Sequence, residues 1–304
     1  MTLNLDNKPH CLEDTTRLLE DFYNEDNMAL GKIGNRFQLL EQLGTGGYGT
    51  VFKAYDEATK STVALKVDHE EDQTEGRDEA EKYKVLHGVE GLPKVIISGT
   101  HEKKHYIAME LLGEDLWEAC RYSKLSQKDV FIVAIKCLNI IEKIHTKGIL
   151  HCDIKPENIM TGKLDKKQYF LMDFGLATFY MDENGKHKDM VKASPRGSPD
   201  FASLNCHKKT SLSRRDDLES LAYTLLFILN GELPWSNTWY SHYEMSRLSP
   251  KEMFKNHSPV FAAYLEYCRN LNFEEKPDYL FLIKLFQDEA KRKYPFINFS
   301  FSGF

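Results

Sequence analysis

Several features that would place this chain in a special class of protein are missing from its sequence. The longest apolar stretches, Leu221–Leu229 and Val130–Ile135, are far shorter than the roughly 20 residues that a membrane-spanning helix needs. The six cysteines form no C-x-x-C pair, which in a chain of 304 residues is typical of reduced thiols inside the cell. No basic start is followed by an apolar run, so we expect no secretory signal and an intracellular location, in the cytoplasm, the nucleus or both.

An excess of positive charge is missing as well. The net charge is −6, which argues against a protein that coats nucleic acid. The first 30 residues carry seven acidic and two basic side chains, a balance of −5, so the rest of the chain is almost neutral. We therefore expect an acidic N-terminal extension over residues 1–30, in which residues 12–26 have the apolar spacing of a short helix.

The rest of the chain has ordinary globular composition, 41% hydrophobic and 28% charged, and its pattern changes near residue 113. Strand-like runs and one helix precede that point, and helical periodicity follows it. One predicted helix begins at a capping box at Ser126 and ends at Gly148. The pattern predicts further helices at about Gln73–Leu86, Asp217–Leu229, Pro259–Leu271 and Asp278–Lys291. We expect an α+β fold over residues 31–292, with a β-rich lobe (about 35–112), a mostly helical lobe (about 113–292) and a short tail (293–304).

A glycine-rich segment lies between two of the strand-like runs and matches G-x-G-x-x-G-x-V. Its residues are Gly44, Gly46, Gly47, Gly49 and Val51. Glycines allow backbone N–H groups to approach phosphates where any Cβ would clash. A Rossmann loop needs a helix directly afterwards, and a Walker A loop needs G-K-[ST]; neither is present. The order strand–glycines–strand favours the ATP loop of a protein kinase.

A lysine follows at the distance that such a loop requires. Ala64 and Lys66 belong to a V-A-L-K strand, in which the lysine is expected to neutralise the α- and β-phosphates. A lone lysine could instead be an ordinary surface charge. The helix that should supply its carboxylate partner offers Glu79 and Glu81, and counting back from the Gly91–Pro93 segment favours Glu79.

The strongest single motif is H-C-D-I-K-P-E-N at residues 151–158. In it, Asp153 is expected to orient the attacking hydroxyl, Lys155 to stabilise the transferring phosphoryl group and Asn158 to hold a metal ion. Asp173 of the following D-F-G motif is expected to bind Mg²⁺. The motifs together predict a protein kinase that uses ATP and Mg²⁺, and Lys155 two places after the aspartate is typical of the Ser/Thr type.

These motifs and several further segments resemble the casein kinase 1 family over roughly residues 35–290. The segments are Gly91–Val95, Met109–Leu116, Ser203–Asn205, Ser213–Leu221, Leu233–Trp235 and Phe273–Tyr279. The resemblance implies a bilobal kinase fold, with adenine meeting the backbone of Glu110 and Leu112 behind Met109. It also implies that Asp217 anchors the catalytic loop, and that a monomer phosphorylates Ser or Thr in acidic or already phosphorylated proteins.

The chain departs from the family pattern at places that concern phosphate. Cys152 stands where an arginine usually pairs with activation-segment phosphate, so we expect no phosphorylation switch there. Asp200 replaces the arginine of G-T-A-R, and Ser236–Glu244 replaces a lysine-bearing stretch. A carboxylate repels a dianion, so we expect no strong preference for phosphate-primed substrates. For the Cys152 thiol itself, a buried filler is favoured over a redox-sensitive group.

Other functions are weaker fits to the sequence. A nucleotide-binding pseudokinase or scaffold is the main alternative, although no catalytic residue is missing. A small-molecule phosphotransferase is disfavoured by the long peptide-type segment from Asp173 to Asn205. The H-E-x-x-H match at residues 101–105 follows Ser98-Gly99-Thr100 and leads into a strand, so we expect a hairpin turn and not a zinc site.

Overall fold

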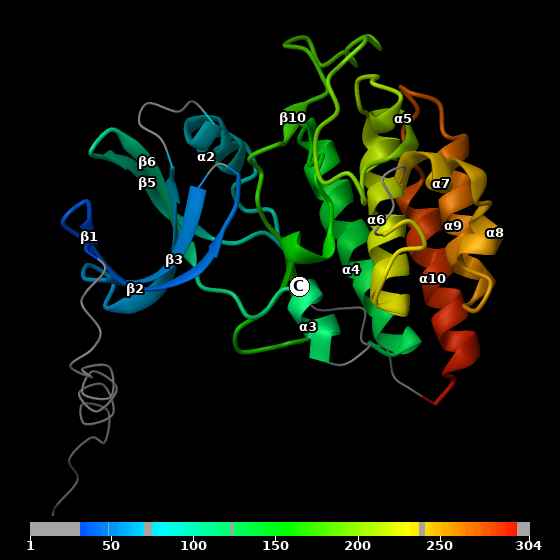
Figure 1. The fold of residues 1–304 in the computed structure, drawn as a ribbon, viewed down its shortest axis with the longest axis horizontal. Helices are drawn as coiled ribbons and strands as arrows, with labels where there is room; N and C mark the ends of the chain where they lie inside the picture. The colour runs from blue at the N-terminus through cyan, green and yellow to red at the C-terminus, as the bar shows by residue number, and fades with distance from the viewer. Residues whose placement is uncertain (1–30, 48, 70–74, 123–124, 237–240, 297–304) are drawn as a thin grey trace, which may run out of the picture.

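The computed structural model describes residues 31–47, 49–69, 75–122, 125–236 and 241–296. The acidic extension and the helix expected within it at residues 12–26 therefore lie outside the described residues. Tyr48 of the glycine-rich segment, part of the substituted stretch 236–244 and the end of the tail also lie outside them. The described chain folds into two lobes, one built on a β-sheet and one built from helices (Figure 1).

The first lobe is a six-stranded antiparallel sheet with the strand order β1-β2-β3-β4-β6-β5. Its strands are β1 (Lys32–Ile33), β2 (Phe37–Thr45), β3 (Gly49–Asp56), β4 (Ser61–Asp68), β5 (Val95–His101) and β6 (Lys104–Glu110). Helix α2 (Glu75–Val85) packs against β6, within the range expected for the first helix.

The two faces of strand β4 contact different cores, because side chains of a strand alternate between faces. Val63 and Leu65 belong to a small core on the outer face of the sheet. Ala64 belongs to the large core that continues under α2 and into the helical lobe. Lys66 shares the face of Ala64, so the strand period alone directs this lysine toward α2 and the space between the lobes.

The expected hairpin at residues 101–105 is confirmed. Strand β5 ends at His101 and β6 begins at Lys104, and the two strands pair directly. Glu102 and Lys103 form the turn with φ angles of 48° and 64°, values that tight hairpin turns require. The two histidines therefore sit on neighbouring strands and not on one helical face.

The second lobe is organised around two long helices, α4 and α6 (Figure 1). Ser126 caps α4 by accepting from the backbone N–H of Asp129 (3.3 Å), and Gly148 follows the helix with a φ of 80°. Gly231 ends α6 in the left-handed conformation, as glycine allows. The main helices are α4 (Gln127–Thr146), α6 (Arg214–Asn230), α9 (Pro259–Asn270) and α10 (Tyr279–Lys293).

Short elements complete this lobe, and the sequence pattern did not predict them. They are the helices α3 (Leu116–Tyr122), α5 (Leu204–His207), α7 (Ser241–Arg247) and α8 (Pro250–Met253), the turn η1 (Pro156–Asn158), and the strand pairs β7 (Ile149–Leu150) with β10 (Thr178–Phe179) and β8 (Ile159–Thr161) with β9 (Tyr169–Leu171). Elements of two to seven residues contain too few periods to be recognised.

The bilobal α+β architecture is thus the one expected, with the connection between lobes running from the end of β6 at Glu110 to the start of α3 at Leu116. In the tail, Tyr294 packs edge-on against Phe131 of α4, whereas Phe296 is exposed. Among the helices of the described residues, none combines the length and the apolar character needed to cross a bilayer.

Candidate active site

Lys66 lies at the centre of a three-part ion cluster that joins the two lobes. Its Nζ atom is 2.7 Å from Glu79 Oε2 on α2 and 2.8 Å from Asp173 Oδ1 of the D-F-G segment. Burial acts to lower the pKa of Lys66, but the attraction of the two carboxylates outweighs it and raises this pKa. Burial acts to raise the pKa of Asp173, but the attraction of Lys66 and its hydrogen bond outweigh burial and lower this pKa. Lysine and aspartate are therefore both charged near neutral pH.

The structure decides between the two candidate glutamates. Glu79 is buried and directed at Lys66, whereas Glu81 is exposed and pairs with Lys84 on the same helix. Residues two apart on a helix point in nearly opposite directions, so only one of the pair can face the lysine. Burial raises the pKa of Glu79 and Lys66 acts against that rise.

The glycine-rich segment forms the end of the β2–β3 hairpin. Gly46 N donates to Gly49 O (2.9 Å), which closes the turn. A Cβ atom built on Gly49 would lie only 2.6 Å from the carbonyl oxygen of Val67, so no larger residue fits there. Glycine at this position allows the hairpin to lie close against β4.

A cavity lies beneath this hairpin and contains most of the residues expected to bind the nucleotide. Its lining is Gly46, Gly47, Gly49, Val51, Ala64, Lys66, Glu79, Tyr83, Met109, Met172 and Asp173. Gly44, Glu110 and Leu112 do not line it. Glu110 instead forms the end of β6, where its backbone N–H donates to Lys94 O and its carboxylate accepts from Lys94 N (2.7 Å).

Asp153 lies in the catalytic loop with its carboxylate held from three sides. Its Oδ1 atom accepts from Ser198 N (2.7 Å), and its Oδ2 atom is 3.0 Å from Lys155 Nζ and 3.1 Å from Asn158 Nδ2. Asn158 also donates to the backbone oxygen of Asp153 (2.8 Å). Lys155 donates in addition to Ser198 Oγ (2.8 Å). The loop therefore presents a carboxylate, an ammonium group and a hydroxyl at one place.

Asn158 and Asp173 have the chemistry that a magnesium site requires. The amide nitrogen of Asn158 is occupied by Asp153, which leaves its amide oxygen as the group available to a cation. Met172 N donates to Asn158 O (3.0 Å), so the segments that carry Asn158 and Asp173 are joined directly. Mg²⁺ prefers oxygen ligands and commonly takes one or two from protein and the others from phosphates and water. The two residues fit that pattern.

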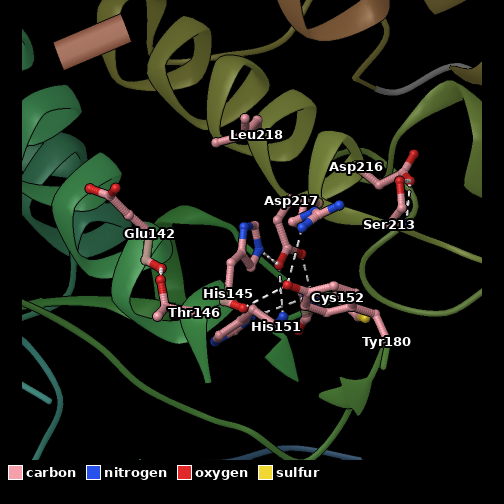
Figure 2. Close-up of polar contacts among 12 residues, drawn as sticks. Glu142, His145, Thr146, His151, Cys152, Tyr180, Ser213, Asp216, Asp217 and Leu218 are labelled. Atoms are coloured by element: carbon pink, nitrogen blue, oxygen red, sulfur yellow. Dashed lines mark hydrogen bonds and ion pairs between the residues drawn. The ribbon is translucent and has the colours of Figure 1, made fainter. Parts of the chain in front are cut away.

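Asp217 on α6 points toward the catalytic loop and holds it by hydrogen bonds (Figure 2). Its Oδ2 atom accepts from His151 N and from His145 Nε2, and its Oδ1 atom accepts from Cys152 N, each at 2.8 Å. Burial opposes ionisation, but the hydrogen bond from His145 and its positive field lower the pKa of Asp217. Cys152 adopts a φ of 66°, which is rare for a residue with a side chain, and its N–H bond to Asp217 supports this conformation.

The Cys152 side chain supports the interpretation of a buried filler. It packs with Leu150 and Tyr180 in a small apolar cluster and is only 8% exposed. Burial raises the pKa of its thiol well above the ordinary value. A thiol that is neither exposed nor ionised is a poor target for oxidants.

Two residues of the site were missed by the reasoning from sequence. Ser198 contacts both Asp153 and Lys155. Its place in the sequence, directly after Gly197, does not predict these contacts. The Tyr83 hydroxyl accepts from Asp173 N (3.3 Å), and its ring packs edge-on against Phe174. Tyr83 lies one helical turn after Glu79, and this spacing could have predicted that both side chains face the site.

A comparison with protein-family models agrees with this geometry. The model described as "Protein kinase domain" matches residues 37–287, which is most of the chain and includes both lobes. It spans the glycine-rich hairpin, the Lys66 cluster, the catalytic loop and α6 with Asp217. The chain therefore belongs to the protein kinase domain family.

Proposed function

We propose that this chain is a catalytically active Ser/Thr protein kinase of casein kinase 1 type. The observation that carries the proposal is the assembled state of the site. Lys66 bridges Glu79 and Asp173, and Asp153 contacts Lys155 and Asn158, all at hydrogen-bonding distance. A pseudokinase has no need to keep every one of these groups in place.

The residues suggest how each step would be performed. ATP would bind beneath the glycine-rich hairpin, with Lys66 on its α- and β-phosphates and with Asp173 and Asn158 holding Mg²⁺. The metal ion would neutralise charge on the transferring phosphoryl group. Asp153 would accept the hydrogen bond of the substrate hydroxyl and orient it toward the phosphorus. Lys155 would stabilise the charge that develops during transfer.

The assembled site also supports the proposal that activation-segment phosphorylation is not a switch. Asp217 fixes the catalytic loop through its hydrogen bonds to the backbone of His151 and Cys152, and Cys152 offers a thiol where an anion-binding arginine would stand. The Ser198 hydroxyl is already engaged by Lys155. Phosphatase treatment should leave the activity unchanged. Activity that requires phosphate on Ser194 or Ser198 would contradict this part of the proposal.

The proposal also covers the substrates, the oligomeric state and the location of the protein. We propose protein substrates that need no priming phosphate, because Asp200 stands in the segment that contacts the catalytic loop. We also propose a monomer that works inside the cell. The five cysteines among the described residues are all free and buried, as expected of a reduced protein.

The test is transfer of labelled γ-phosphate from Mg-ATP to casein by the wild type, by Asp153→Asn and by the control Asp288→Asn. Asp288 is exposed on α10, in the helical lobe away from the sheet. We expect full transfer by the wild type and control, and a loss of about 10³-fold in Asp153→Asn. Equal transfer by wild type and Asp153→Asn would defeat the catalytic assignment. ATP binding without any transfer by the wild type would indicate a pseudokinase.

A further inference from the structure

His145 on α4 connects Asp217 to the last long helix of the fold. Its Nε2 atom lies 2.8 Å from Asp217 Oδ2, toward which the ring points in Figure 2, and its Nδ1 atom lies 2.5 Å from the hydroxyl of Tyr279. Asp217 in turn accepts from two backbone N–H groups of the catalytic loop. A continuous line of hydrogen bonds therefore runs from the start of α10 through α4 and α6 to the residues directly before Asp153.

The three side chains in this line are shielded from water. Tyr279, His145 and Asp217 are each only 2–3% exposed. A buried polar atom has to find its partner inside the protein, because water cannot replace a hydrogen bond that is lost there. Burial raises the pKa of Tyr279, so its hydroxyl keeps its proton and stays a hydrogen-bonding partner for the histidine ring.

The two ring nitrogens of His145 depend on each other, because the bond made by one determines the state of the other. Asp217 Oδ2 is an acceptor, so Nε2 has to carry a proton to bond with it. Tyr279 holds the opposite nitrogen, and its hydroxyl can donate to a neutral ring or accept from a charged one. In both states, the contact with Tyr279 keeps the Nε2 proton directed at Asp217.

A second tyrosine holds the backbone of the same histidine. Tyr180, which directly follows β10, donates from its hydroxyl to His145 O (2.7 Å), and this hydroxyl accepts from Arg214 Nη1 (3.3 Å). The main chain of His145 is therefore fixed without help from α10. The contribution of Tyr279 is the orientation of the ring.

We propose that Tyr279 is a positioning residue for phosphoryl transfer, which acts through His145 and Asp217 on the backbone before Asp153. The inference rests on the proposed kinase function and adds to it a residue that lies outside the nucleotide cavity and the catalytic loop. Without the hydroxyl, Nδ1 is buried without this partner, and the ring can rotate or move its proton from Nε2 to Nδ1. An Nε2 atom that has no proton repels the carboxylate, so Asp217 and the loop that it holds are displaced.

The test compares Tyr279→Phe with Tyr264→Phe in steady-state transfer from Mg-ATP to casein. Tyr264 on α9 is the matched control, because its buried hydroxyl donates to the backbone oxygen of Leu218 (2.9 Å), the neighbour of Asp217. Each substitution removes one buried hydrogen bond, so we expect similar falls in Tm, about 2–4 °C. Only Tyr279→Phe should lower kcat, by about tenfold, with little change in the KM for ATP or for casein.

A double-mutant cycle shows whether the effect passes through the histidine ring. In His145→Gln, the side-chain amide can still donate to Asp217 but has no second ring nitrogen for Tyr279 to hold. Adding Tyr279→Phe to this variant should therefore lower kcat no further. A second fall of about tenfold would overturn the inference, because Tyr279 would then act by another route.

Two results for the single variants would also overturn the inference. Equal falls in kcat for Tyr279→Phe and Tyr264→Phe would show that the loss of any buried hydrogen bond near α6 has this effect. An unchanged kcat in Tyr279→Phe would show that the ring of His145 stays in place without the hydroxyl. Absence of transfer by both the wild type and Tyr264→Phe would instead contradict the proposed function, and with it this inference.

Discussion

Replacing Asp217 with asparagine would remove one of the three hydrogen bonds that hold the catalytic loop on α6. Asparagine has one acceptor oxygen, which can keep the bonds from His151 N and His145 Nε2. Its amide nitrogen then faces Cys152 N, where two donors oppose each other. A hydrogen bond to a charged group contributes about 1.5–3 kcal/mol, and a buried donor left unpaired costs about as much as the bond itself. We expect Asp217→Asn to lower the free energy of unfolding by about 3 kcal/mol.

This loss has two separate readouts. For a chain of this size, about 3 kcal/mol corresponds to a fall in Tm of roughly 6–12 °C, which thermal unfolding followed by circular dichroism can measure. The left-handed conformation of Cys152 also loses its support, so Asp153 moves from its position. A displacement of about 1 Å can cost 10²-fold in rate, and we expect a fall of this size in kcat. Asp288→Asn is the control for both measurements.

The effect of Asp217→Asn on stability should also depend on pH. The pKa of Asp217 is lowered in the folded state, so its contribution is fully present above the ordinary carboxyl pKa of about 4 and is lost as the pH falls below it. The stability difference between wild type and Asp217→Asn should therefore be constant above about pH 5 and shrink under more acidic conditions. A Tm within 2 °C of wild type at pH 7, or a difference that grows in acid, would refute the reasoning.

Three further changes test other parts of the site. Gly49→Ala places a Cβ against the carbonyl oxygen of Val67, and we expect the KM for ATP to rise about tenfold in steady-state assays. Tyr83→Phe removes the hydroxyl that accepts from Asp173 N, and we expect kcat to fall roughly 3- to 10-fold with little change in KM for the substrate protein. The thiol of Cys152 should resist iodoacetamide in the folded enzyme and react after unfolding, as followed by mass spectrometry.

Each of these predictions has a result that contradicts it. Gly44 has open space around it, so Gly44→Ala should raise the KM less than Gly49→Ala; equal effects would mean that the clash is not the cause. An unchanged kcat in Tyr83→Phe would show that the ring alone positions the D-F-G segment. Rapid alkylation of native Cys152 would reopen the interpretation of a redox-sensitive thiol.

The site residues that belong to short local motifs could be predicted from the sequence, and the structure brings them together. Asp153, Lys155 and Asn158 lie within six consecutive residues, so the path of one loop is enough to bring them together. Lys66 could be assigned because it lies in a V-A-L-K strand at the expected distance after the glycine-rich segment. The long helices could be predicted for a similar reason, since capping residues and apolar periodicity are local signals.

The contacts that were missed depend on how distant segments meet. Ser198 reaches Asp153 only because the activation segment folds back across the catalytic loop, and no local pattern records that path. Glu79 was favoured over Glu81 by the count back from Gly91–Pro93, and the structure pairs it with Lys66, but the rotation of α2 that decides this is weakly specified by a short helix with few apolar residues. Which residue pairs with a buried group is decided by the tertiary fold, so it cannot be predicted from local sequence patterns.

The activity proposed for the assembled site is the transfer of phosphate to serine or threonine. Its most direct test is a single-turnover reaction of the wild-type chain with [γ-³²P]ATP, Mg²⁺ and casein, followed by phosphoamino-acid separation. We expect label in phosphoserine and phosphothreonine, and loss of that label in Asp153→Asn with ATP binding retained. Label in phosphotyrosine, or bound ATP that is never consumed by the wild type, would contradict it.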